Sequence, residues 1–188
     1  KYIGKGTSDL NYKPYEIVTY GDKKVAFIGI VTPESFTKST PAYFQDESGN
    51  YIYSFSEDET GTALYETVQK TVDEVELRDE VKKAGANYVI ALAHLGNEGT
   101  TDRWSSKAVI ANTTGIDAVL DGHDHIAGVQ KVANKDGKQI VLTEPGTKFE
   151  NLGKLTIKTD GTITAELISP KEFTEKDAGI TAYITKLT

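Results

Sequence analysis

Two apolar segments constrain the fold of this 188-residue chain more than any other feature. Residues 24–32 (KVAFIGIVT) and 87–93 (NYVIALA) are almost entirely apolar, so both are predicted to be strands buried on two faces. Helical spacing of apolar residues predicts a helix over 62–84 and a second over 104–113, and a short strand follows at 117–120. This alternating order predicts parallel strands joined by right-handed crossovers.

The flanking segments predict antiparallel pairing. Polar and apolar residues alternate over 15–20, which predicts a half-exposed strand. A turn at Gly21-Asp22 is expected to connect it to the strand at 24–32. Two Asp-Gly pairs, which are strong hairpin signals, each separate two further strands. The predicted strand pairs are 129–133 with 139–143, and 154–158 with 162–167. The predicted fold class is therefore α/β, with a mixed sheet and C-terminal hairpins.

The composition excludes several classes of partner and site. The net charge is −7, which argues against a nucleic-acid polymer as partner, because phosphate backbones require a basic surface. The chain has no cysteine, so disulfides and thiolate metal sites are excluded. No apolar run reaches the roughly 18 residues of a membrane span. An acidic protein can still bind a phosphate ester if metal ions supply positive charge.

The three histidines of the chain are the main candidates for chemistry. His94 follows one predicted parallel strand, and Gly122-His123-Asp124-His125 follows the next. Open α/β sheets place their ligand crevice at these strand ends, so we expect the three rings to converge there on a metal. Gly122 is expected to let the backbone turn tightly and aim both rings inward. The alternative is that these are hydrogen-bonded polar residues at loop starts.

Four motifs occur in a fixed order along the chain: VAFIGIVTPE at 25–34, AHLG at 93–96, GHDH at 122–125, and PGT to NLG over 145–153. In these motifs, over about residues 12–170, the chain resembles the calcineurin-like metallophosphoesterases. It is most similar to the secreted 5'-nucleotidase and 2',3'-cyclic-nucleotide 2'-phosphodiesterase branch. The departures are Ala93 and Asp124, where the family usually has Ser or Thr. The resemblance implies the second half of a layered α-β-β-α sandwich.

The resemblance also implies a ligand scheme. His94 and His123 would bind one metal and His125 the other, and the complete domain would hold two divalent ions of Zn, Mn, Fe or Ni. The family's N-terminal series of Asp-X-His, then Gly-Asp, then Gly-Asn-His does not occur in that order in this chain. These motifs are expected in a missing N-terminal half, so no catalytic residue is assigned to this chain. Three neutral imidazoles are expected to hold at most one ion, weakly.

The expected domain boundaries and activity follow from the same resemblance. Residues 1–174 are expected to be the C-terminal half of the domain, and 175–188 the start of a linker helix to a nucleotide-binding domain. The implied activity is hydrolysis of a nucleoside 5'-monophosphate or a 2',3'-cyclic nucleotide by an extracellular or cell-surface protein. The alternatives are a non-catalytic metal-binding or structural fragment, or a chain that works only when paired with the missing half.

Weaker hypotheses concern surface and loop residues. Asn97 and Thr147 are candidate substrate-binding residues near the predicted metal edge, although either could be an ordinary loop residue. Asp117 and Asp121 are expected to form turns. Aromatic residues in the long segment 41–61 are expected to pack that loop onto the domain rather than bind a base. They are Tyr43, Tyr51, Tyr53 and Phe55. Finally, an uncovered apolar face on strands 24–32 and 87–93 predicts self-association or a covering partner.

Overall fold

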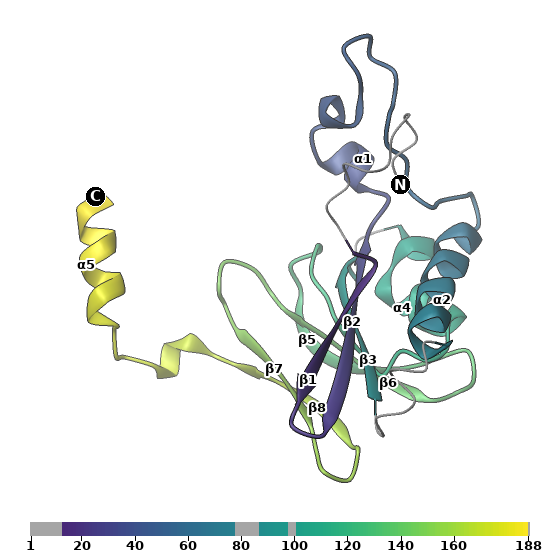
Figure 1. Ribbon diagram of the computed structural model, residues 1–188. Helices are drawn as coiled ribbons and strands as arrows, with labels where there is room; N and C mark the ends of the chain where they lie inside the picture. Colours follow the sequence, from purple (N-terminus) through teal and green to yellow (C-terminus); the bar gives the residue numbers. More distant parts are fainter. Residues whose placement is uncertain (1–12, 78–86, 98–100, 188) are drawn as a thin grey trace.

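The computed structural model describes residues 13–77, 87–97 and 101–187. A six-stranded mixed sheet forms its centre, in the order β1-β2-β3-β4-β6-β5 (Figure 1). The four inner strands run parallel, and the two edge strands pair antiparallel to their neighbours. The strands are β1 (Tyr15–Tyr20), β2 (Lys23–Val31), β3 (Asn87–His94), β4 (Ala118–Leu120), β5 (Ala127–Ala133) and β6 (Gln139–Pro145). The predicted α/β class with a mixed sheet is confirmed.

A separate hairpin and four helices complete the described architecture. The hairpin is β7 (Leu152–Ile157) with β8 (Ile163–Ile168). The helices are α1 (Ser35–Lys38), α2 (Thr62–Leu77), α4 (Ser106–Asn112) and α5 (Ala178–Leu187), with 3₁₀ turns η1 (Pro41–Phe44), η2 (Asp102–Trp104) and η3 (Pro170–Glu172). The helix predicted over 62–84 is present as far as Leu77, and its remainder lies outside the described residues. Among the described residues, no helix has the length and apolar character needed to span a membrane.

One face of the sheet packs against α2 and α4, which lie on the same side of it (Figure 1). Alternation along β2 directs Ala26, Ile28 and Ile30 to this face. There they pack with Val68 and Val72 of α2, and all five side chains are buried. Burying an apolar side chain of this size stabilises a fold by about 1.5–3 kcal/mol, so this layer fixes the register of the central strands.

The opposite face is covered only in part. Leu155 and Ile163 of the β7–β8 hairpin pack against a buried cluster that includes Val25 of β2 and Ile90 of β3. Further along the same strands, Val31 is 49% exposed and Leu92 is 47% exposed. The expectation of a broad uncovered face is therefore corrected: the chain's own hairpin covers the start of the strands, and an apolar surface remains near their C-terminal ends.

The long segment after α1 packs through its aromatic rings. The Phe36 ring stacks on Phe44 with centroids 5.4 Å apart and meets Tyr51 at 4.9 Å and Phe55 at 5.2 Å. These contacts support the structural interpretation of the aromatic residues over base binding. Tyr43 is the exception, because it is 79% exposed.

Helix α5 stands apart from the sheet and the other helices (Figure 1). Its apolar residues recur at helical spacing and are all exposed; they are Ile180, Tyr183, Ile184 and Leu187. An amphipathic helix with an exposed apolar face gains little stability from packing, so α5 contributes little to the sheet domain.

We predict that the exposed surface at Val31 and Leu92 drives self-association. The double variant Val31→Thr, Leu92→Gln should shift the chain toward monomer, because it removes apolar area that gains about 25 cal/mol per Å² when covered. Its free energy of unfolding should change by less than about 1 kcal/mol, as both side chains are half exposed. Sedimentation velocity at micromolar concentration measures the effect.

The matched control is Ile184→Gln on α5, which removes exposed apolar area at a site outside the sheet. Its sedimentation should equal that of the unsubstituted chain. A chain that is monomeric across the whole concentration range, or association that responds only to Ile184→Gln, would contradict the prediction.

Candidate metal site

The polar candidates gather at the C-terminal ends of the parallel strands. Glu34 follows β2 through Thr32 and Pro33, and His94 is the last residue of β3. The loop after β4 carries His123 and His125. Because neighbouring parallel strands end at the same edge of the sheet, these side chains are brought to one place although they are far apart in sequence.

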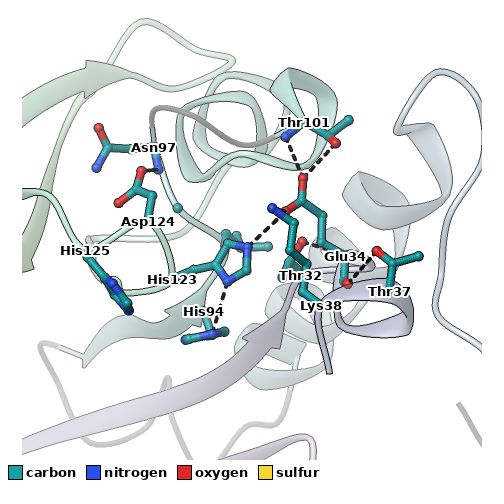
Figure 2. Close-up of polar contacts among 12 residues, drawn as sticks. Thr32, Glu34, Thr37, Lys38, His94, Asn97, Thr101, His123, Asp124 and His125 are labelled. Carbon is teal, nitrogen blue, oxygen red and sulfur yellow. Dashed lines mark hydrogen bonds and ion pairs between the residues drawn. The ribbon is translucent and has the colours of Figure 1, made fainter. Parts of the chain in front are cut away.

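His94 and His123 form a close pair of imidazoles. Nδ1 of His123 lies 3.2 Å from Nε2 of His94, and the two ring centroids are 4.9 Å apart. Figure 2 shows the His125 ring away from this pair, on the other side of the loop. The structure thus brings two of the three candidate ligands together and does not place the third with them.

The His94–His123 pair fits two ligands of one ion. Zinc binds imidazole nitrogen at about 2.0–2.1 Å, so two nitrogens on a tetrahedral ion lie about 3.3 Å apart, close to the spacing of the pair. Within the part of the chain that the structure describes, no group of three or more His, Asp or Glu side chains is arranged to hold a metal. The pair is therefore a partial ligand set.

The loop after β4 achieves its turn in an unexpected way. His123 has φ 101° and His125 has φ 64°, both in the left-handed region that non-glycine residues rarely adopt. Gly122, which was expected to allow the tight turn, does not itself take a left-handed conformation, since its φ is not positive. The two histidines carry the strained backbone themselves, and such strain persists only where surrounding contacts enforce it.

The Asp121 carboxylate supplies those contacts. Its Oδ1 accepts hydrogen bonds from the backbone amides of Leu95 at 2.9 Å and Gly122 at 2.8 Å, and Gly96 adds a longer one at 3.3 Å. Ser106 at the start of α4 donates its hydroxyl to Oδ2. Asp121 is 8% exposed, so it ties the loops after β3 and β4 together from within. The turn-forming role expected for it is corrected, because three of the four donors come from other segments of the chain.

A second polar network lies on the His125 side of the loop. The backbone amide of Asn97 donates to Oδ2 of Asp124 at 2.7 Å. The side-chain amide of Asn97 donates to Oε2 of Glu144 at 3.1 Å. Oε1 of Glu144 accepts from the His125 backbone at 3.1 Å. Desolvation by burial, followed by the hydrogen bond and charge of Asp124, raises the pKa of Glu144 to about 8. Glu144 is thus held neutral near pH 7 beside Asp124.

This network uses most of the Asn97 side chain. Its Oδ1 also accepts from Gln130 at 3.0 Å, and the residue is 9% exposed. These contacts support a structural role, and substrate binding by Asn97 stays a prediction. Thr147 lies half-buried in the loop after β6, where its backbone amide donates to Glu150 at 3.3 Å. Its substrate role also stays a prediction.

Glu34 is the site residue that sequence reasoning missed. Its Oε2 lies 3.0 Å from Nε2 of His123, and its Oε1 accepts from both the backbone and the hydroxyl of Thr101 at 2.7 Å (Figure 2). Burial alone would raise the pKa of Glu34, but hydrogen bonds from His123 and Thr101, with the charge of Lys38, outweigh it and lower the pKa to about 2. The available signal was its position at the end of the first motif, three residues after a buried parallel strand.

We predict that Asp121→Ala strongly destabilises the chain. The variant leaves several buried donors without an acceptor, which should cost roughly 3 kcal/mol or more of unfolding free energy. Chemical denaturation followed by circular dichroism measures this cost. Asp73→Asn, at an exposed position on α2, is the matched control and should change the unfolding free energy by less than about 0.5 kcal/mol. Equal stability of the two variants would contradict the role given to Asp121.

Comparison with known proteins finds a relative in sequence and several solved structures with a shared fold, although no family model matches the chain. The sequence is 31% identical over 164 residues to a 5'-nucleotidase from Bos taurus, an alignment that covers 79% of this chain and 24% of that protein. The chain therefore spans about a quarter of the length of this curated relative.

Solved structures share its fold at low sequence identity. The calcineurin-like phosphoesterase YfkN from Bacillus subtilis matches 94% of this chain and 57% of its own, with a TM-score of 0.58 and 23% identity. The sulfate thiohydrolase SoxB from Thermus thermophilus matches 93% of this chain and 28% of its own, with a TM-score of 0.63 and 19% identity. A putative 5'-nucleotidase from Staphylococcus aureus matches 99% and 35%, with a TM-score of 0.56 and 17% identity.

Each comparison covers most of this chain and a smaller share of the other protein. The chain thus has the fold of the calcineurin-like phosphoesterases and is similar in sequence to a 5'-nucleotidase, and it spans only part of each of these larger proteins.

Proposed function

We propose that the chain is part of a metal-dependent phosphoric ester hydrolase that acts on nucleotides. In this proposal His94 and His123 bind one divalent ion and His125 contributes to a second. The observation that carries it is the 3.2 Å approach of Nδ1 of His123 to Nε2 of His94 at the strand ends, which suits two ligands of a single ion. The separate position of the His125 ring is consistent with a different ion (Figure 2).

The chemistry of the site requires a cation. The chain carries a net charge of −7, and Asp121 and Asp124 lie around the histidine loop, so a phosphate ester needs positive charge supplied there. Bound Zn, Mn, Fe or Ni would supply Lewis acidity at the phosphoryl oxygens and lower the pKa of a coordinated water. The residues of this chain orient two imidazoles toward one point and hold them there.

Three histidines do not complete such a site. Zinc sites in proteins use at least three protein ligands for each catalytic ion, and the described residues offer only the His94–His123 pair at one point. We propose that the remaining ligands, including bridging carboxylates, and the catalytic residue that contacts phosphate belong to another part of the domain. The isolated chain then holds at most one ion, with low affinity.

The substrate class rests on the relatives. The bovine relative is a 5'-nucleotidase and a structural neighbour from Haemophilus influenzae is an NAD nucleotidase. We propose a nucleoside 5'-monophosphate or a 2',3'-cyclic nucleotide as substrate, an extracellular or cell-surface location, and α5 as the start of a linker helix to a nucleotide-binding domain. The alternative is a non-catalytic metal-binding or structural fragment.

We predict that the chain binds one zinc ion with low affinity through the His94–His123 pair. Titration calorimetry with ZnCl₂ should give close to one site per chain, and His94→Ala should abolish it because a single imidazole remains at that point. The matched control is His125→Ala, whose ring lies away from the pair and should leave the zinc affinity within about threefold. Loss of binding in His125→Ala with retention in His94→Ala would overturn the ligand assignment.

We also predict negligible hydrolysis by the isolated chain. A complete site lowers the barrier only when charge stabilisation and nucleophile activation are both preorganised, and the pair alone provides neither carboxylate bridge nor phosphate contact. The purified chain, with Mn²⁺ or Zn²⁺, should release no phosphate from a 5'-mononucleotide beyond the rate in metal-only buffer. Multiple turnovers that His123→Ala abolishes would show that these residues hold a complete site.

A further inference from the structure

We infer that Glu34 is a positioning residue for His123: it fixes the ring so that the unprotonated Nδ1, rather than Nε2, faces His94. This inference rests on the proposed function only in its metal-binding part. It concerns a residue that belongs to no histidine motif and that lies after a different strand, β2, at the start of α1. The geometry carries it in three steps.

The first step is the contact between Glu34 and His123. Nε2 of His123 lies 3.0 Å from Oε2 of Glu34, and the two side chains are only 12% and 8% exposed. An ionised carboxylate can only accept hydrogen bonds, so Nε2 must carry the proton that it donates. In the neutral ring the other nitrogen, Nδ1, is then unprotonated. That nitrogen is the one that lies 3.2 Å from His94.

The second step is that Glu34 itself cannot easily rotate away. Its Oε1 accepts two hydrogen bonds from Thr101, one from the backbone amide and one from the hydroxyl, both at 2.7 Å. Its backbone amide donates to the Thr32 hydroxyl at 3.1 Å. Lys38, one helical turn further on, adds an ion pair at 3.7 Å from an exposed position. Each carboxylate oxygen therefore has an assigned partner (Figure 2).

The third step is the strained backbone of His123. With φ 101°, this residue lacks the support of a regular backbone conformation, so its ring orientation depends on side-chain contacts. Metal-bound histidines commonly donate their second ring N–H to a carboxylate, and loss of that partner typically lowers metal affinity by 10–100-fold. Glu34 stands in the right position for that role.

Glu34→Gln tests the inference because the side-chain amide of glutamine has one acceptor oxygen, whereas the Glu34 carboxylate has two. Two Thr101 donors require that oxygen at the Oε1 position, which leaves the amide N–H group facing Nε2 of His123. His123 must then accept at Nε2 and carry its proton on Nδ1, so the variant should invert the tautomer. Lys38→Gln is the matched control, since it removes the exposed ion pair and leaves both hydrogen-bonded oxygens in place.

Long-range ¹⁵N–¹H correlation spectra of the three histidines report the tautomer in the full chain at pH 8.5 with chelator present. We expect the proton on Nε2 of His123 in the unsubstituted chain and in Lys38→Gln, and on Nδ1 in Glu34→Gln. In zinc titrations, Glu34→Gln should bind 10–100-fold more weakly and Lys38→Gln within about twofold.

A proton on Nδ1 of His123 in the unsubstituted chain would overturn the inference without any substitution, so misfolding of a variant cannot leave it untested. An unchanged tautomer in folded Glu34→Gln would also overturn it. If the expected tautomers are observed but the unsubstituted chain binds no zinc, the proposed metal role fails and the assignment of Glu34 as the residue that positions His123 stands.

Discussion

The buried carboxylate of Asp121 is the contact on which the arrangement of the site depends. It stands directly after the shortest inner strand, β4, and accepts hydrogen bonds from the loop after β3 and from the start of α4. A buried peptide amide without an acceptor costs free energy, so loss of the carboxylate would leave these donors unpaired and destabilise both loops. Two separate loops are thereby fixed to one strand end, and His94 and His123 are fixed with them.

A second carboxylate, that of Glu34, orients the His123 ring within this arrangement. Glu34 lies in the segment between β2 and α1, and its contact with Nε2 of His123 leaves Nδ1 directed at His94. The two carboxylates have different tasks, because Asp121 binds mainly backbone donors and Glu34 binds a ring nitrogen. An acidic protein can in this way present neutral imidazoles toward a cation while its own buried charges are hydrogen-bonded. The left-handed backbone of His123 is stable only in such surroundings.

Much of the fold could be predicted from the sequence, because β2 and β3 are unbroken apolar runs and each hairpin has an Asp-Gly turn. Because the histidines follow predicted parallel strands, the sequence also placed them at one edge of the sheet. Sequence reasoning failed where side-chain contacts decide the outcome. Asp121 and Glu34 look like ordinary loop acids until the strands are assembled, and no local pattern shows that His123, rather than Gly122, takes the positive φ. The packing of β7–β8 on the sheet could not be predicted either, because it joins residues that are distant in sequence.

X-ray absorption at the zinc edge of the zinc-loaded chain counts the imidazoles around the ion and so tests whether His94 and His123 bind it together. We expect two imidazole nitrogens at about 2.0–2.1 Å, with oxygen atoms completing the coordination, and an identical spectrum for His125→Ala. A spectrum with three imidazoles, or one that loses an imidazole in His125→Ala, would contradict the claim that His94 and His123 together form a separate metal-binding pair.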